Sequence, residues 1–286
     1  MSDLDFSKLT SLNVTIEDKI AHIQLCRPEK LNSMIPEFWS ELPTVVNQID
    51  DYSAARVIVI SAQGNYFSAG MDLAVFAGMG NLFGGEPARD AERVRRMVLE
   101  LQASFNVLET CRIPVLAAVQ GGAIGGAVNM LTACDSRYCT QDAFFSIKET
   151  EIGMTADVGT LQRLPHLIPH GLARELAYMG RKMDSAEAKD CGFVNQVFAD
   201  QETMIDAVMA IAIKIAANSP LAVTGCKEMI NYARDHSVAD SLNYMATWQN
   251  GMIQMGDIQE SMKAGQEKRL PEYKELHNKI SLLKPK

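Results

Sequence analysis

The feature that most constrains the fold is a pair of short apolar segments, each followed by a glycine-containing loop. Residues 56–61 read Arg-Val-Ile-Val-Ile-Ser, and residues 115–119 read Val-Leu-Ala-Ala-Val. Runs of this kind are typical of strands buried on both faces of a parallel sheet. The second run leads into Gly121–Gly126, which we expect to open a helix. The alternation predicts an α/β fold in which ligands bind at the loops that follow the strands.

Other segments extend this pattern along the chain. Two runs of alternating hydrophobicity, Leu12–Glu17 and Ile20–Leu25, predict an antiparallel pair of strands joined at Asp18 and Lys19. Hydrophobic periodicity predicts two more helices and a third strand: residues 36–49, 87–110 and 144–147.

The pattern divides the chain into two parts. Residues 1–200 carry the alternation of strands and helices, which we expect to form the core. From about Thr203 the pattern is helix after helix, and Ser219-Pro220 is typical of an N-cap followed by a first helical residue. We therefore expect residues 201–286 to form a helical region for packing or subunit contact.

Charge and hydropathy argue against two classes of partner. The net charge of the 286 residues is −8, whereas broad nucleic-acid-binding surfaces need clustered Lys and Arg to neutralise phosphates. The longest apolar runs, such as residues 205–217, are interrupted by charges and are too short to span a bilayer. The acidic start shows no secretory or transit signal. We therefore expect a cytoplasmic protein without a nucleic-acid or membrane partner.

The six cysteines include no CxxC pair, and they fit reduced cytosolic thiols. Cys134, Asp135 and Cys139 lie near one another in the sequence, but no histidine accompanies them. Zinc sites usually gather their ligands at tighter spacing. We interpret these residues as structural and expect no metal site.

The Gly121–Gly126 loop is a candidate anion site. A helix that opens at Gly125 or Gly126 directs unsatisfied N–H groups and the positive end of its dipole into the loop. These groups would stabilise an oxyanion, although the same pattern also occurs in phosphate loops and where elements pack closely. The GxGxxG spacing of dinucleotide-binding loops is absent.

Two further segments carry candidate chemistry. Phe67–Leu73 follows the first apolar strand and could offer another backbone N–H group to the same oxyanion. Glu149 and Asp157 follow the third strand, beside apolar Ile147 and Ile152. Carboxyl groups in apolar surroundings have raised pKa values, which suit proton transfer. Spacing alone favours the interpretation that these residues are two solvated loop acids.

With these segments in view, the chain resembles the crotonase superfamily over nearly its whole length and in the same order. The matching segments are residues 13–32 (with Arg-Pro-Glu-Lys-Leu-Asn at 27–32), 67–73, 121–126, 159–165, 186–188 and 267–269. Residues 133–145 and 156–165 are similar to the delta-3,5-delta-2,4-dienoyl-CoA isomerases of that superfamily. The resemblance implies a spiral of ββα units with a C-terminal helical trimerisation region, assembled as homotrimers or hexamers.

The resemblance also implies a reaction, in which 3,5-dienoyl-CoA becomes 2,4-dienoyl-CoA. Glu149 and Asp157 fall at the positions of the acid–base pair, and the N–H groups of Met71 and Gly126 at those of the oxyanion hole. Glu149 is expected to take the C2 proton and Asp157 to deliver one to C6, although the opposite assignment stays open. The residues implied in substrate binding are Arg27, Lys30, Ala69, Asp72 and Asn129. No cofactor is expected, because coenzyme A is part of the substrate.

Asn129 departs from this pattern, because the dienoyl isomerases usually have an aspartate there. Enoyl-CoA hydratases have a second glutamate at the position of Asn129 and a glycine at that of Asp157. An asparagine cannot act as a carboxylate base. Hydration or a shorter double-bond shift is therefore a weaker alternative. A non-catalytic member that binds CoA or RNA would have no need for two acids in an apolar pocket.

Overall fold

The strands of the described residues form two sheets, and helices accompany them, as expected for an α/β protein. The computed structural model describes residues 4–79 and 84–279. The larger sheet has the order β1-β2-β3-β4-β6-β9, and the smaller has the order β5-β7-β8. The strands are β1 (Leu12–Glu17), β2 (Ile20–Leu25), β3 (Val57–Ala62), β4 (Val115–Val119), β5 (Gly122–Ile124), β6 (Ser136–Thr140), β7 (Phe144–Ser146), β8 (Lys182–Asp184) and β9 (Gln196–Phe198).

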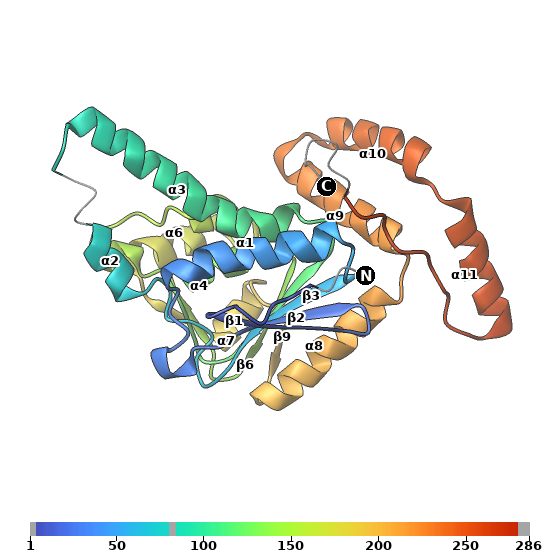
Figure 1. The fold of residues 1–286 in the computed structure, drawn as a ribbon, viewed down its shortest axis with the longest axis horizontal. Helices are drawn as coiled ribbons and strands as arrows, with labels where there is room; N and C mark the ends of the chain where they lie inside the picture. Colours follow the sequence, from blue (N-terminus) through green and yellow to red (C-terminus); the bar gives the residue numbers. More distant parts are fainter. Residues whose placement is uncertain (1–3, 80–83, 280–286) are drawn as a thin grey trace.

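The helices alternate with these strands and then continue alone at the C-terminal end (Figure 1). The α-helices are α1 (Pro36–Asp51), α2 (Leu73–Met79), α3 (Pro87–Thr110), α4 (Gly126–Thr132), α5 (Thr160–Arg163), α6 (His170–Met179), α7 (Ser185–Asp190), α8 (Gln201–Ala216), α9 (Pro220–Asp235), α10 (Val238–Met252) and α11 (Met255–Glu267). Short 3₁₀ helices accompany them at Pro28–Lys30, Glu149–Ile152 and Leu164–His166.

The long predicted elements are confirmed. β1 and β2 pair antiparallel, whereas β2, β3, β4, β6 and β9 run parallel. The expected helix start at Gly125 or Gly126 is confirmed, but the sequence did not predict that Gly122–Ile124, just before it, forms β5 beside β7. The helix α4 begins only at Gly126. β5, β8 and β9 have three residues each, which is too short for a periodic pattern to show in the sequence.

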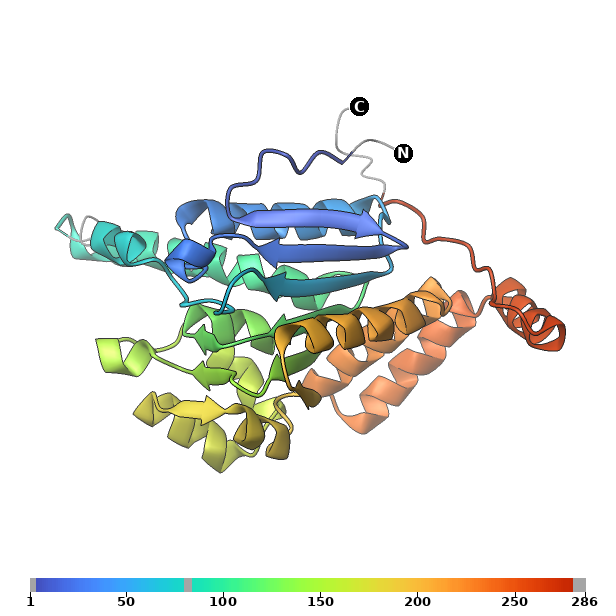
Figure 2. The ribbon, with the colours of Figure 1, turned by 90° about the horizontal axis from the view of Figure 1, so that it is seen from below.

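The alternating sides of β3 explain its unbroken apolar sequence. Ile58 and Ile60 belong to the core beneath α1 and α3, where the rings of Phe38 and Phe105 meet at 6.3 Å between centroids. The residues on the opposite face of β3 are buried together with apolar side chains of α8, including Met204. Figure 2 shows α8 lying across this second face. Helices therefore cover both faces of the sheet.

The last three helices project beyond the sheet (Figure 1). The predicted cap at Ser219 is confirmed, because its side chain accepts a hydrogen bond from Ala222 N–H. α9 is anchored by Lys227, whose buried ammonium group donates to Leu108 O and pairs with Asp135. In the described ranges, no single helix is long and apolar enough to cross a membrane. Taken together, α8 and α9 have the length and composition of a membrane-spanning segment, but the chain bends by 106° between them.

Candidate active site

The loops after β3 and β4 lie directly against each other. Ser68 N–H donates to Gly122 O at 3.1 Å, and Ile124 N–H donates back to Ser68 O at 3.0 Å. Gly70 allows the closest approach: it has φ +82°, and a Cβ built on it would lie 2.5 Å from Ile124 O. Any side chain at this position would therefore push the two loops apart.

This contact brings two free backbone N–H groups together. Met34 N–H donates to Gly70 O, and Asp72 N–H donates to Met34 O, so that the N–H of Met71 points away from this pairing. Gly126 is the first residue of α4, whose first N–H groups have no partner within the helix. A Cβ built on Gly126 would lie 3.6 Å from Met71 N. Neither N–H group has an acceptor among residues 4–79 and 84–279, and the pair could bind an oxyanion.

Glu149 lies at the edge of the same glycine loop. A Cβ built on Gly125 would lie 3.6 Å from Glu149 Oε1, and this oxygen accepts a hydrogen bond of 2.9 Å from Asn129 Nδ2. The other oxygen, Oε2, is buried and has no partner among the described residues. Burial raises the pKa of Glu149, and the charge of Asp157 raises it further, while the bond from Asn129 opposes both. An unpaired buried carboxylate oxygen is costly unless a ligand or water meets it.

Asp157 is half-buried, and burial raises its pKa as well. Its backbone is fixed by α3, because Gln102 Nε2 donates to Asp157 O at 2.7 Å. No hydrogen bond or ion pair to another described side chain occupies its carboxylate. The structure thus brings the two predicted acids close enough to interact through charge, and each has a free oxygen.

Asn129 is fully buried, with an exposed fraction of 0%. Its Oδ1 accepts from Thr160 N–H at 2.8 Å, and its Nδ2 donates to Glu149 Oε1 and to Gly125 O. The side chain therefore has no exposed atom to offer a ligand. The contact with substrate that the family pattern implies is replaced by a contact with Glu149.

The other predicted binding residues lie in or beside the loop after β2, residues 26–35, which we call the first loop. Arg27 donates to Ser33 O at 2.7 Å, and its guanidinium lies 3.9 Å from Asp72 Oδ2. Asp72 also accepts hydrogen bonds from Ser33 Oγ and from the N–H of Ala74, in the first turn of α2. These hydrogen bonds are the main cause of the lowered pKa of Asp72, and the charges of Arg27 and of exposed Lys30 lower it further. One loop therefore presents two cations held near an anion.

Ala69 is tied to the same loop, because its N–H donates to Leu31 O at 2.9 Å. Sequence reasoning missed Gln102 and Thr160, which orient Asp157 and Asn129. No local signal identifies them, because each acts through a contact between segments far apart in the chain.

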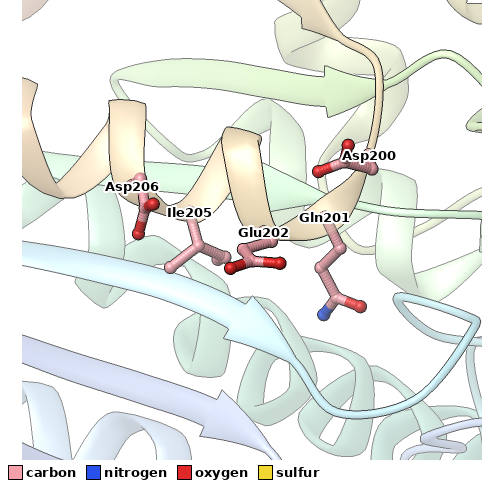
Figure 3. Close-up of a pocket in the computed structure, with 5 residues that line it drawn as sticks. All are labelled: Asp200, Gln201, Glu202, Ile205 and Asp206. Atoms are coloured by element: carbon pink, nitrogen blue, oxygen red, sulfur yellow. The ribbon is translucent and has the colours of Figure 1, made fainter.

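A pocket at the start of α8 has a different character. It is lined by three acids, Asp200, Glu202 and Asp206, together with Gln201 and Ile205 (Figure 3). Carboxylates repel phosphate groups, so this pocket is a poor site for coenzyme A. Among the residues that the structure describes, no three His, Cys, Asp or Glu side chains are grouped for metal binding.

Known proteins of one family match the chain. The family model described as enoyl-CoA hydratase/isomerase matches residues 15–277. The chain is 47% identical to the mitochondrial delta(3,5)-delta(2,4)-dienoyl-CoA isomerase of Mus musculus over 262 residues, or 91% of this chain and 80% of the mouse protein. It is 37% identical to the peroxisomal protein of the same name from Arabidopsis thaliana over 273 residues, or 95% of this chain and 98% of that protein.

These names contradict the expectation of a cytoplasmic protein, because the relatives are named mitochondrial or peroxisomal. The expectation rested partly on unpaired cysteines. Unpaired thiols indicate a reducing environment and do not distinguish the compartments that provide one.

Solved structures agree with the sequence comparison. An enoyl-CoA hydratase from Bacillus anthracis has a TM-score of 0.83 at 30% identity, covering 95% of this chain and 100% of its own. A putative enoyl-CoA hydratase from Thermobifida fusca, solved with acetoacetyl-CoA, has a TM-score of 0.75 at 30% identity, covering 84% of this chain and 93% of its own. The order of the elements, the paired glycine loops and these matches together show that the chain belongs to the enoyl-CoA hydratase/isomerase family, the crotonase superfamily.

Proposed function

We propose that this chain is an isomerase that converts 3,5-dienoyl-CoA to 2,4-dienoyl-CoA. The observation that carries the proposal is the pair Glu149 and Asp157, two partly buried carboxyls with raised pKa values and free oxygens. The reaction needs one group to remove a proton and a second to add one at a distant carbon. The names of the relatives at 47% and 37% identity support the same reaction.

In the proposed mechanism, the thioester oxygen accepts hydrogen bonds from the N–H groups of Met71 and Gly126. Glu149 removes a proton from C2, and the two N–H groups stabilise the enolate charge that forms on the oxygen. The C2–H electron pair forms the C2=C3 bond, the C3=C4 pair moves to C4=C5, and the C5=C6 pair takes a proton from Asp157 at C6. Glu149 must therefore begin ionised and Asp157 protonated.

We further propose that the first loop binds the coenzyme A part of the substrate. Arg27 and Lys30 would meet its phosphates, while Asp72 and Ser33 hold the Arg27 guanidinium in place. The backbone of Ala69 lies beside them and would contact the same part of the ligand. Coenzyme A enters here as part of the substrate.

The direct test is to follow ultraviolet absorbance while purified protein is mixed with a 3,5-dienoyl-CoA. We expect loss of the 3,5-diene and gain of a 2,4-dienoyl thioester, in which the diene is conjugated with the carbonyl. Absence of this conversion would refute the proposed function.

Hydration of crotonyl-CoA is expected to be at least about 100-fold slower than diene isomerisation, because positioned acid–base groups typically contribute this much or more. The hydratase pattern needs a second glutamate where this chain has Asn129. The amide of Asn129 donates to Glu149 and cannot accept a proton from water. Robust formation of 3-hydroxybutanoyl-CoA by the unmodified protein would favour the hydratase alternative.

Gly70→Ala is expected to lower kcat/KM for the diene by about 10²-fold, the usual effect of losing one oxyanion donor. The new Cβ would clash with Ile124 O and separate the N–H groups of Met71 and Gly126. Gly192→Ala is the matched control: it has a similar φ of +87°, but its Cβ would meet only Leu167 O, at 3.8 Å. Equal losses of activity in both variants would point to backbone strain alone.

We also propose that the C-terminal helices pack against other copies of the chain, as the family resemblance implies. The side chains of α10 are not buried within the described chain, and Leu242 and Met262 are exposed apolar residues on α10 and α11. A cavity of about 950 Å³ is lined mainly by apolar groups of α9 and α10, including Ile230 and Trp248. Exposed apolar side chains gathered on these helices support an oligomer.

A further inference from the structure

The hydrogen bonds of Asn129 define the orientation of its amide. Thr160 N–H can only donate, so the group 2.8 Å from it must be the oxygen Oδ1. Gly125 O can only accept, so the group 3.2 Å from it must be Nδ2, which then also donates to Glu149 Oε1 at 2.9 Å. Two backbone groups that cannot exchange roles therefore fix the donor toward Glu149.

A fixed donor distinguishes between the two protonation states of Glu149. An NH₂ group has no acceptor to offer, so it stabilises the ionised carboxylate and cannot accept a bond from a proton on Oε1. It also occupies Oε1, which leaves the buried and unpaired Oε2 as the oxygen that can take a proton from a ligand. An aspartate at the same place would set two carboxyl groups about 3 Å apart, and such groups share a proton because both cannot ionise together.

We propose that Asn129 is a positioning residue that holds Glu149 ionised, with Oε2 directed at the reacting carbon, and thereby extends activity to lower pH than an aspartate at this position would allow. The inference deepens the proposed function, because it rests on Glu149 as the base. The asparagine that this chain has in place of the usual aspartate of the dienoyl isomerases thus acts on the ionisation of Glu149.

Apart from Asp157, the charged side chains described near Glu149 are engaged with other partners. Asn129 is therefore the main side chain through which the ionisation of Glu149 can be altered. α4 carries no ionisable side chain, and Asp157 is the acid whose charge acts on Glu149 from the following loop. Lys148 and Glu151, on either side in the chain, pair with each other. On the packed helix α6, Glu175 pairs with Arg181, and Arg174 contacts Tyr178.

The test compares Asn129→Asp and Asn129→Ala with the parent, with Asn195→Asp as the matched control. Asn129→Asp keeps the acceptor for Thr160 N–H and removes the donor to Glu149. Asn129→Ala removes the donor without adding a charge. Asn195 also accepts from a backbone N–H, that of Arg137, but it is exposed and lies between α7 and β9. Melting temperatures establish that each variant is folded.

Two readouts report the ionisation of Glu149. The first is the acidic limb of kcat/KM for a 3,5-dienoyl-CoA. The second is the ¹³C NMR titration of labelled glutamate carboxyls in protein without substrate, in which Glu149 is assigned by its absence in Glu149→Gln. The second readout does not depend on turnover, so a protein that lacks isomerase activity would refute the proposed function while the inference about Asn129 could still be judged.

We expect Asn129→Asp to move both the limb and the titration of Glu149 upward by about one pH unit or more, since a shared proton and lost donor act in the same direction. Asn129→Ala should move both upward by less, and Asn195→Asp should move neither. At pH values above the limb, Asn129→Asp should keep kcat within about tenfold of the parent, or ~1.4 kcal/mol of barrier. An unchanged titration of Glu149 in both Asn129 variants would overturn the inference, as would a uniform loss of rate with an unchanged limb.

Discussion

Asp157→Asn is expected to lower kcat for diene isomerisation by about 10²- to 10⁴-fold, the range that a positioned proton donor contributes. The substitution keeps the size of the side chain but removes the proton that the reaction needs at C6. Its backbone should stay in place, because the hydrogen bond from Gln102 goes to the main-chain carbonyl. The binding of a dienoyl-CoA, measured by calorimetry, should therefore survive while turnover is lost.

Asp190→Asn, on the exposed side of α7, serves as the control and should be indistinguishable from the parent. Exchange of the C2 protons of butanoyl-CoA with deuterated water gives a second measurement on Asp157→Asn. This exchange needs only the base, so we expect it to persist. Its acidic limb then reports the ionisation of Glu149 alone, because an asparagine at position 157 does not titrate. Near-normal diene turnover in Asp157→Asn would contradict the assignment.

Glu149→Gln is expected to lower kcat by a similar factor of about 10²- to 10⁴-fold, and to abolish C2 exchange as well. A glutamine oxygen can still accept the hydrogen bond from Asn129, so the loop should keep its structure, but an amide cannot remove a proton from carbon. Mass spectrometry of recovered butanoyl-CoA, after incubation in deuterated water, measures the exchange directly.

The matched control for Glu149→Gln is Glu151→Gln, two positions along in the same 3₁₀ helix. Glu151 is exposed and pairs with Lys148 at the surface, where such pairs contribute about 0–1 kcal/mol, so little effect on rate is expected. If C2 exchange persisted in Glu149→Gln and vanished in Asp157→Asn, the two acids would have the opposite assignments. If it persisted in both, neither would be the C2 base.

The pH dependence of the parent follows from the same two groups. Glu149 must be ionised to act, and its pKa is raised by burial first and by Asp157 second, so activity should fall as the pH drops through a value above the ordinary range for glutamate. Asp157 must be protonated, and its raised pKa keeps the acid form to higher pH than usual. A bell-shaped profile of kcat/KM would report macroscopic pKa values that belong to the interacting pair.

The sequence by itself determined the long elements and the candidate acids. β3 and β4 were predictable because each strand is buried on both faces and so is apolar throughout, and α1 and α3 because their periodicity reflects one buried side. Glu149 and Asp157 could be proposed because two acids beside apolar residues are unusual and because the surrounding segments resemble a known family in order. β5, β8 and β9 have three residues each and lacked enough residues to show a pattern.

Only the tertiary structure decided how these residues act on one another. It sets Gly70 against Ile124, which brings two N–H groups from separate loops to one place, and it seats the amide of Asn129 between Glu149 and Thr160. Hydrogen-bond direction, burial and the resulting pKa shifts depend on distances between segments far apart in the chain. The sequence specifies which groups are present, but the free energy of a charge depends on the dipoles and solvent around it, and these are fixed only when the chain folds.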